Sequence, residues 1–109
     1  MPQIMNHLGQ VVPVNFLFNE GDLIIHTDPN VDCGPYLVEA FGIEGRNIWR
    51  LHNIRSGGHA YQGSDQPTCR EFLRSWSMRD DWSWVLVPST RWGIRLPIGM
   101  PNLGAYQHG

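Results

Sequence analysis

Histidine and cysteine are the residue types here that most often bind metals or react directly, and their spacing is the first indication of function. His7, His52 and His59 have no spacing that suggests a metal triad. Cys33 and Cys69 lack metal-ligand spacing and are too few for a disulfide scaffold, so buried free thiols are expected. No Ser-His-Asp or Cys-His set can be recognised. The sequence therefore predicts no metal site and no catalytic set made of protein groups alone.

The positively charged side chains are the second set of residues that could bind a ligand. All eight basic residues are Arg, whose planar fork suits phosphate or carboxylate, although codon composition can equally explain the absence of Lys. Arg50 and Arg55 fall on one candidate strand but would point to opposite faces, so they are not expected to share one phosphate. The net charge of −2 and the absence of any Lys/Arg run give nucleic-acid binding little electrostatic support.

The length and composition predict one globular domain spanning residues 1–109. Charged residues make up only 17%, and five Trp side chains bury much area and favour interfaces, so oligomerisation is a natural expectation. The N-terminus has no secretory signal, and the apolar runs are far too short for a membrane span. We therefore expect a soluble cytoplasmic protein without membrane contacts.

Strand patterns dominate the first half of the chain. Residues 11–18 and 23–27 are apolar and β-branched, and the turn residues 19–22 between them predict an antiparallel hairpin, with Pro13 marking an edge or a bulge. Residues 36–43 are expected to form a strand, with a short helix as the alternative. Residues 48–55 alternate in a way typical of a strand between a core and a polar site or interface.

The second half contains the only convincing helix. Residues 56–64 hold three glycines and are expected to form a loop. Residues 68–76 carry an apolar stripe at helical spacing, with Ser64 or Asp65 as candidate caps. Residues 82–87 and 91–98 are expected to form the last strands. Five or six short antiparallel strands with one helix predict a mainly β fold, either a small barrel or a sandwich.

Five segments of the chain occur in the order seen in a known family. Residues 9–16 (GQVVPVNF) and 21–27 (GDLIIHT) resemble the G-x-P-x-V-P-V-N-Y … D-G-D-x-I-x-F-x-T hairpin of the pyridoxamine 5′-phosphate oxidase-like family. Residues 36–43 and 47–57 lie where that family has its next two strands. Residues 76–96 (WSMRDDWSWVLVPSTRWGIRL) resemble its closing segment. The family's opening helix and first strand are nearly missing, so the match is to a form shortened at its N-terminus.

This resemblance implies a fold, a cofactor and an activity. It implies an FMN-binding split β-barrel that works as a homodimer, with each flavin in a groove between two protomers. The flavoprotein would be an oxidoreductase that exchanges hydride or electrons with a small organic substrate. An empty catalytic list agrees with this activity, because the cofactor carries the chemistry. The candidate cofactor-binding residues are Asn15, His26, Thr27, Trp49, Arg50 and Arg95.

Each candidate residue has an expected role and an alternative. Asn15 matches the Asn of the family motif, and its neighbours would offer backbone groups to the isoalloxazine edge. His26 and Thr27 would donate hydrogen bonds to the phosphate or the ring edge, and Arg95 would reach the flavin or a substrate carboxylate. Solvent-side, core or surface ion-pair roles are the alternatives for these positions. Arg50 replaces the Ser that follows the family's Trp, which is Trp49 here.

The loop after residue 27 (DPNVDCG) differs from the family pattern. It carries two carboxylates and no base, and carboxylates repel a phosphate. This loop favours the second hypothesis, a non-catalytic β-barrel that has lost flavin affinity and acts as a binding or interaction module. A deazaflavin is a further alternative to FMN, and so is haem with His26 or His59 as its axial ligand.

Overall fold

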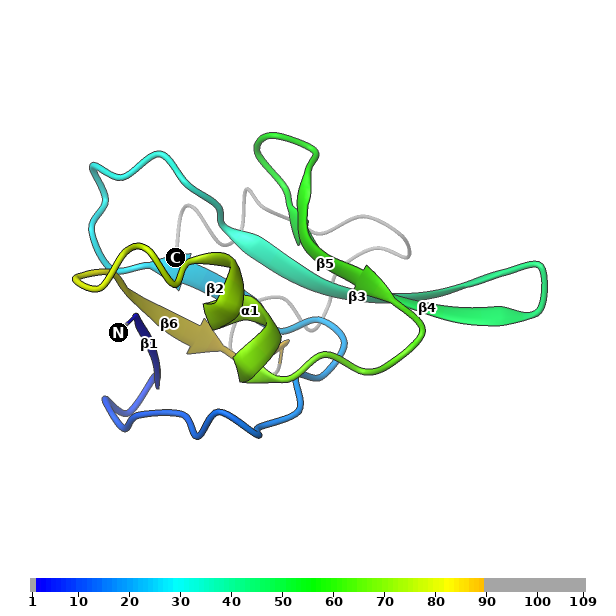
Figure 1. The fold of residues 1–109 in the computed structure, drawn as a ribbon, viewed down its shortest axis with the longest axis horizontal. Coiled ribbons are helices and arrows are strands. Elements are labelled where there is room, and N and C mark those ends of the chain that lie inside the picture. Colours follow the sequence, from blue (N-terminus) through cyan, green and yellow to red (C-terminus); the bar gives the residue numbers. More distant parts are fainter. Residues whose placement is uncertain (1, 90–109) are drawn as a thin grey trace.

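Six segments pair into one mixed sheet in the computed structural model, which describes residues 2–89 (Figure 1). The strand order is β1-β6-β2-β3-β4-β5, and one helix lies between β5 and β6 in the chain. The elements are β1 (Gln3–Asn6), β2 (Leu23–His26), β3 (Tyr36–Ile43), β4 (Arg46–Asn53), β5 (His59–Gly63), α1 (Cys69–Ser75) and β6 (Ser83–Val87).

The mainly β class with one helix is confirmed, but the expected barrel differs from what is found. β1 and β5 form the two ends of the strand order, so the sheet of the described residues is open rather than closed. The β1–β6 pair is parallel, whereas all other pairs are antiparallel. No helix among residues 2–89 is long and apolar enough to cross a membrane.

The predicted hairpin of residues 11–18 and 23–27 is wrong. Residues 11–18 make only two isolated bridges with other described residues. Two of their backbone carbonyl groups instead accept hydrogen bonds from the first turn of α1. The N–H groups of Cys69 and Arg70 donate to the carbonyl oxygens of Phe16 and Val14, both at 2.9 Å. These N–H groups belong to the first turn of the helix and have no partner within it. Strand β2 pairs with β3 and β6.

Strands β1 and β5 lie where no strand was expected. β1 is short and finds its partner β6 about 80 residues along the chain, a pairing that no local pattern encodes. β5 falls inside the glycine-rich segment and pairs with β4 across a register shift at Leu51 and His52. The strand predicted over residues 91–98 lies outside the described residues.

Helix α1 was predicted correctly, but its cap was not. The N-cap is Thr68 rather than Ser64 or Asp65, and the Glu71 carboxylate accepts the Thr68 backbone N–H at 3.1 Å and also its hydroxyl. Phe72 packs edge-to-face on Tyr36 and Trp84, with ring centroids 5.2 and 4.8 Å apart. The helix therefore covers one face of the sheet and closes the main apolar core there.

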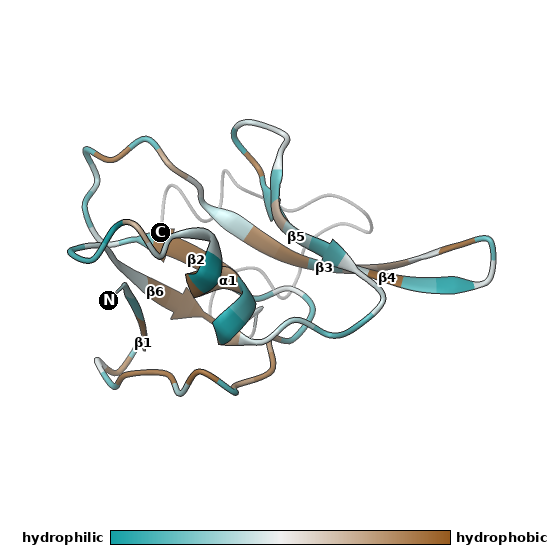
Figure 2. Ribbon diagram, in the orientation of Figure 1, coloured by the Kyte–Doolittle hydropathy of each residue, from teal (hydrophilic) through white to brown (hydrophobic). Residues whose placement is uncertain are grey.

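The β3–β4 hairpin projects from the rest of the molecule as an arm (Figure 1). Its turn has Glu44 and Gly45 at φ values of 51° and 79°, which is the geometry of a two-residue type I′ turn. The pairing runs without a break from Tyr36 opposite Asn53 to Ile43 opposite Arg46. In Figure 2 the apolar colour continues along the end of β3 toward the tip, whereas β4 begins with polar residues.

Candidate functional site

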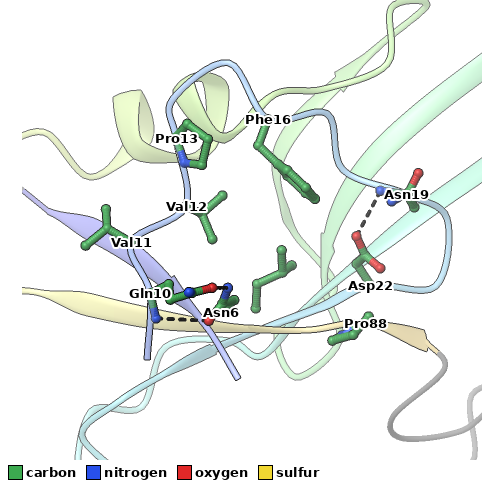
Figure 3. A pocket seen from close by; sticks show the side chains of 10 residues that line it. Asn6, Gln10, Val11, Val12, Pro13, Phe16, Asn19, Asp22 and Pro88 are labelled. Atoms are coloured by element: carbon green, nitrogen blue, oxygen red, sulfur yellow. Dashed lines mark hydrogen bonds between the residues drawn. The ribbon is translucent and has the colours of Figure 1, made fainter. Parts of the chain in front are cut away.

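A cleft lies where the segment after β1 crosses the ends of β2 and β6 (Figure 3). Its volume is about 310 Å³. Apolar side chains form most of the lining, and two amide side chains from the loop and two polar residues from the turn before β2 complete it. The lining residues are Asn6, Gln10, Val11, Val12, Pro13, Phe16, Asn19, Asp22, Leu86 and Pro88.

The loop wall of the cleft is built by Asn6. Its Oδ1 accepts the N–H groups of Leu8 and Gln10 at 2.9 and 3.0 Å, and its Nδ2 donates to Gln10 Oε1 at 2.9 Å. The Asn6 N–H donates to the Gln10 carbonyl at 2.7 Å, and Gly9 takes a φ of 82° within the turn. These bonds fix the Gln10 side-chain oxygen, so its amide N–H₂ remains the donor that the wall offers to a ligand.

Asp22 is the buried acid of the cleft. Its residue is 2% exposed, and its Oδ2 accepts the Asn19 N–H at 2.9 Å while its own N–H donates to the Asn19 carbonyl at 3.0 Å. Burial raises the pKa of this carboxyl above its usual range, although hydrogen bonds from the Asn19 and Ser89 backbones oppose that change. Asp22 is the only ionisable side chain in the cleft lining, so the described cleft offers an anion no positive charge.

His26, a predicted cofactor ligand, lies in the aromatic core instead. Its ring meets Trp82 and Trp84 edge-to-face, with centroids 4.7 and 4.8 Å apart. Its Nδ1 accepts the Asp28 N–H at 2.9 Å, which places the proton of the neutral ring on Nε2. Nε2 is buried without a hydrogen-bond partner among the described residues. A haem iron could reach this nitrogen only after the two indole rings moved.

Thr27 and Asn15 lie on the surface, away from the cleft. Thr27 continues the β2–β6 pairing: its N–H and its hydroxyl both donate to the Ser83 carbonyl at 3.1 Å, and the two hydroxyls lie 2.8 Å apart. Asn15 is exposed in the segment that caps α1 and does not line the cleft, whereas its neighbour Phe16 does. The position next to Asn15, rather than Asn15 itself, therefore contributes to the cleft.

Trp49 and Arg50 lie on the projecting arm. Trp49 pairs with Ala40 toward the outer end of β3. His26 lies two residues beyond the Ile24–Tyr36 pair, past the start of β3. The two positions are therefore about 20 Å apart along the sheet at the usual strand rise. Arg50 Nε is 2.9 Å from Glu39 Oε1, and its guanidinium lies over the Phe41 ring at 4.9 Å. Arg50 is thus already paired within the arm.

Five of the six predicted cofactor residues lie in the described part of the chain, and they do not come together there. Arg95 lies outside the described residues, and the other five are divided among the aromatic core, the β2 edge, the capping segment and the arm. The residues that do line a cleft, above all Asn6, Gln10 and Asp22, were not predicted. Asp22 gave a local signal only as a turn residue, because nothing in the sequence reveals that its carboxyl becomes buried.

The remaining chemical groups of the described chain form no second reactive site. No group of three or more His, Cys, Asp or Glu side chains among residues 2–89 could hold a metal ion. The Cys69 thiol is buried, and burial raises its pKa to about 11, so it is unreactive as a nucleophile at neutral pH. A second hollow of about 300 Å³ lies beside the end of α1, between Trp76, Met78 and Arg79.

Comparison of the chain with models of protein families, with curated proteins and with solved structures finds no match. Function is therefore argued from the geometry. The cleft presents apolar walls, an amide donor and one buried carboxyl, which together suit recognition of a small neutral or cationic molecule. Among the described residues, the cleft lining contains no Ser, Thr, Cys or His that could attack a substrate.

Proposed function

We propose that this protein is a non-catalytic binding module that holds a small, mainly apolar organic molecule in the cleft beside Asp22. Ligand sites in proteins are concave and mostly apolar, with a few polar groups that fix orientation, and they measure about 300–1,000 Å³. At about 310 Å³ the cleft is at the lower end of this range, so its ligand is small.

The presence of Asp22 as the sole ionisable group among the described lining residues carries the proposal. A buried carboxyl repels an anion but accepts a hydrogen bond from a hydroxyl or an ammonium group. The Gln10 amide on the loop wall adds a donor for an acceptor atom of the ligand. The favoured ligand therefore combines an apolar ring or chain with an alcohol or amine and carries no negative charge.

The test uses three matched probes that share one ring. Benzyl alcohol, benzylamine and benzoate are titrated into the ¹⁵N-labelled protein, and backbone amide shifts are followed by NMR. The alcohol and the amine are expected to move the signals of Gln10, Val12 and Asn19 in a saturable way, whereas benzoate is expected to leave them unchanged. No saturable shift with the alcohol or the amine would contradict the proposal.

Two variants of the same loop separate binding in the cleft from binding elsewhere. Val11 lines the cleft and is 62% exposed, so Val11→Trp fills the cleft from its rim without disturbing the core. Val14 is 43% exposed and does not line the cleft, so Val14→Trp is the matched control. Val11→Trp is expected to abolish the shifts and Val14→Trp to preserve them. Equal loss in both variants would place the bound probe outside the cleft.

The flavin-dependent oxidoreductase implied by the resemblance is a second proposal, with FMN or a related cofactor between two subunits. The half-exposed side chains of Trp49 and Arg50 on the arm favour it, because a second subunit could cover them. Under this proposal the flavin lies against the arm rather than in the cleft. Its chemistry would be hydride or electron exchange with a small organic substrate.

A flavin titration separates the two proposals. FMN is added to the protein at tens of micromolar, and the quenching of flavin fluorescence is recorded for the unaltered chain, Trp49→Ala and Val11→Trp. Saturable quenching that is lost in Trp49→Ala but kept in Val11→Trp would support the flavoprotein. Absence of quenching in the unaltered chain would remove it and leave the binding module.

A further inference from the structure

One edge of the outer half of β3 has no pairing partner among residues 2–89. β2 pairs with β3 only at Tyr36 and Leu37, and the last bonds on this side are made by Val38. The Val38 N–H donates to the Asp22 carbonyl at 2.9 Å, and its carbonyl accepts the Gly21 N–H at 2.8 Å. Backbone groups alternate in direction along an antiparallel strand, so those of Ala40 and Gly42 point to the same side as those of Val38. No described residue pairs with them there.

The backbone groups on the opposite edge of β3 pair with β4 within the arm. The two-residue turn after Ile43 requires Ile43 and Arg46 to be a hydrogen-bonded pair. Hydrogen-bonded pairs alternate along an antiparallel strand, so the backbone groups of Phe41 and Glu39 also bond to β4. Ala40 and Gly42 together therefore expose two N–H donors and two C=O acceptors in the plane of the sheet. This is the template that another strand needs.

The two end strands of the sheet are covered, in contrast to the arm. Beside β1, the N–H groups of Asn6 and Val12 donate to the carbonyls of Gln10 and Ile4 at 2.7 and 2.8 Å. Beside β5, the Ala60 carbonyl accepts the Ser75 hydroxyl of α1 at 3.0 Å. No described residue makes a comparable backbone bond to Ala40 or Gly42 on the outer part of β3.

The side chains of the arm do not protect this edge. Proteins commonly block such edges with Lys, Pro or a bulge. The outer half of β3 has none of these: it carries Phe41, Ile43 at 50% exposure, and the small residues Ala40 and Gly42. Glu39 is neutralised by Arg50, and Glu44 at the tip is balanced by Arg46, so the arm has no net charge to repel a copy of itself.

We propose that two copies of this chain pair edge to edge through β3, antiparallel about a two-fold axis at Phe41. Ala40 then exchanges both backbone hydrogen bonds with the partner's Gly42, and the symmetry repeats the exchange, which satisfies all four exposed groups. The two Phe41 side chains lie opposite each other at the axis, in a non-hydrogen-bonded pair where cross-strand side chains are closest. The two arms form one continuous four-stranded ribbon. This pairing does not depend on a ligand in the cleft.

The first experiment measures the mass of the full chain in solution. Sedimentation equilibrium is expected to show a dimer that dissociates on dilution. Ala40→Pro removes an N–H that has no partner among residues 2–89, and Phe41→Lys places two positive charges at the axis, so both are expected to give monomers. Leu8→Lys changes an apolar residue at 71% exposure in the loop after β1 and is expected to leave the dimer intact.

Two outcomes of this experiment would contradict the pairing. A monomer at every concentration of the unaltered chain, or a dimer that survives both β3 variants, would overturn the proposal. Circular dichroism confirms that each variant keeps its strands. Should Phe41→Lys fail to fold, Ala40→Pro still decides, because within the described part of a single chain it removes no hydrogen bond and no large apolar side chain.

The second experiment tests the register. Phe41→Cys is expected to form an inter-subunit disulfide under mild oxidation, because residues opposite each other in a non-hydrogen-bonded pair lie about 4.5 Å apart at Cα. Ile43→Cys is the matched control: each copy of residue 43 lies opposite the partner's Glu39, which leaves the two cysteines about 13 Å apart. The unaltered chain shows what Cys33 and Cys69 contribute. Equal crosslinking of both variants, or crosslinking of Ile43→Cys alone, would overturn this register.

Discussion

His26 and Trp84 are cross-strand partners on β2 and β6, and their rings meet edge-to-face with centroids 4.8 Å apart. This relationship places a polar ring at the centre of an aromatic cluster. The Asp28 N–H satisfies Nδ1, and Trp82 closes the other side of the ring. His26 is therefore a core residue that joins the loop after β2 to the aromatic cluster.

We expect His26→Ala to lower the free energy of unfolding by about 2–3 kcal/mol, because it removes two aromatic contacts and leaves a cavity. His59→Ala changes an exposed ring on β5 and is expected to alter stability by no more than about 0.5 kcal/mol. Urea denaturation followed by tryptophan fluorescence measures both. Equal stability of the two variants would show that the His26 contacts contribute little.

The two cysteines are expected to differ sharply in reactivity. Cys69 is buried at the start of α1 and its pKa is raised to about 11, whereas Cys33 is half-buried, with its Sγ 3.8 Å from the Tyr36 hydroxyl. A thiol reagent such as dithiobis-nitrobenzoate should modify Cys33 in the native protein and both thiols in urea. Cys33→Ser should abolish native labelling. Rapid native labelling of that variant would mean that α1 opens readily.

The capping of α1 gives a prediction about acid stability. Burial raises the pKa of the Glu71 carboxyl, but hydrogen bonds from Thr68 outweigh this effect, and the pKa is lowered overall. A lowered folded-state pKa contributes stability above the unfolded value, and this contribution is lost as the pH falls through the folded value. The difference in unfolding free energy between the unaltered chain and Glu71→Ala should therefore shrink as the pH falls below about 4. A difference that does not depend on pH would contradict this.

Thr68→Ala tests the other half of the same cap. We expect it to cost about 1 kcal/mol of unfolding free energy, the usual value for a lost N-cap side chain. Ser77→Ala, which changes an exposed residue just beyond the helix, is the control and should stay within about 0.5 kcal/mol. Thermal denaturation compares the two. A Thr68→Ala variant as stable as the control would show that Glu71 alone maintains the cap.

Asp22 predicts the opposite pH dependence. Its folded-state pKa is raised by burial, so it favours folding most below the unfolded value of about 3.8, and this contribution is lost as the pH rises through the folded value. Asp22→Asn can still accept the Asn19 N–H but carries no charge. The variant should therefore gain stability relative to the unaltered chain as the pH rises from about 3 toward neutrality. Glu20→Gln, an exposed change in the same turn, should show no such trend.

Local signals in the sequence predicted several elements of the fold and almost none of the cleft. Strand β3 was found with its observed bounds, and α1 and β6 within two residues, because apolar periodicity and turn residues act over short distances. The segment of Val11–Phe18 looked equally like a strand. Two of its backbone carbonyl groups instead accept hydrogen bonds from the start of α1. This arrangement depends on contacts between residues more than 50 positions apart.

The sequence by itself determined that this chain forms a mainly β domain with one amphipathic helix, since binary patterning fixes which side chains must leave water. Only the tertiary structure decided which strands meet, because hydrogen-bonding partners in a sheet are set by packing across the whole chain. That packing buries Asp22 beside a cleft, encloses His26 among tryptophans and leaves the outer edge of β3 without a partner in the described part of the chain. Burial and exposure of this kind are properties of the assembled fold, and they determine where the chemistry of this protein can take place.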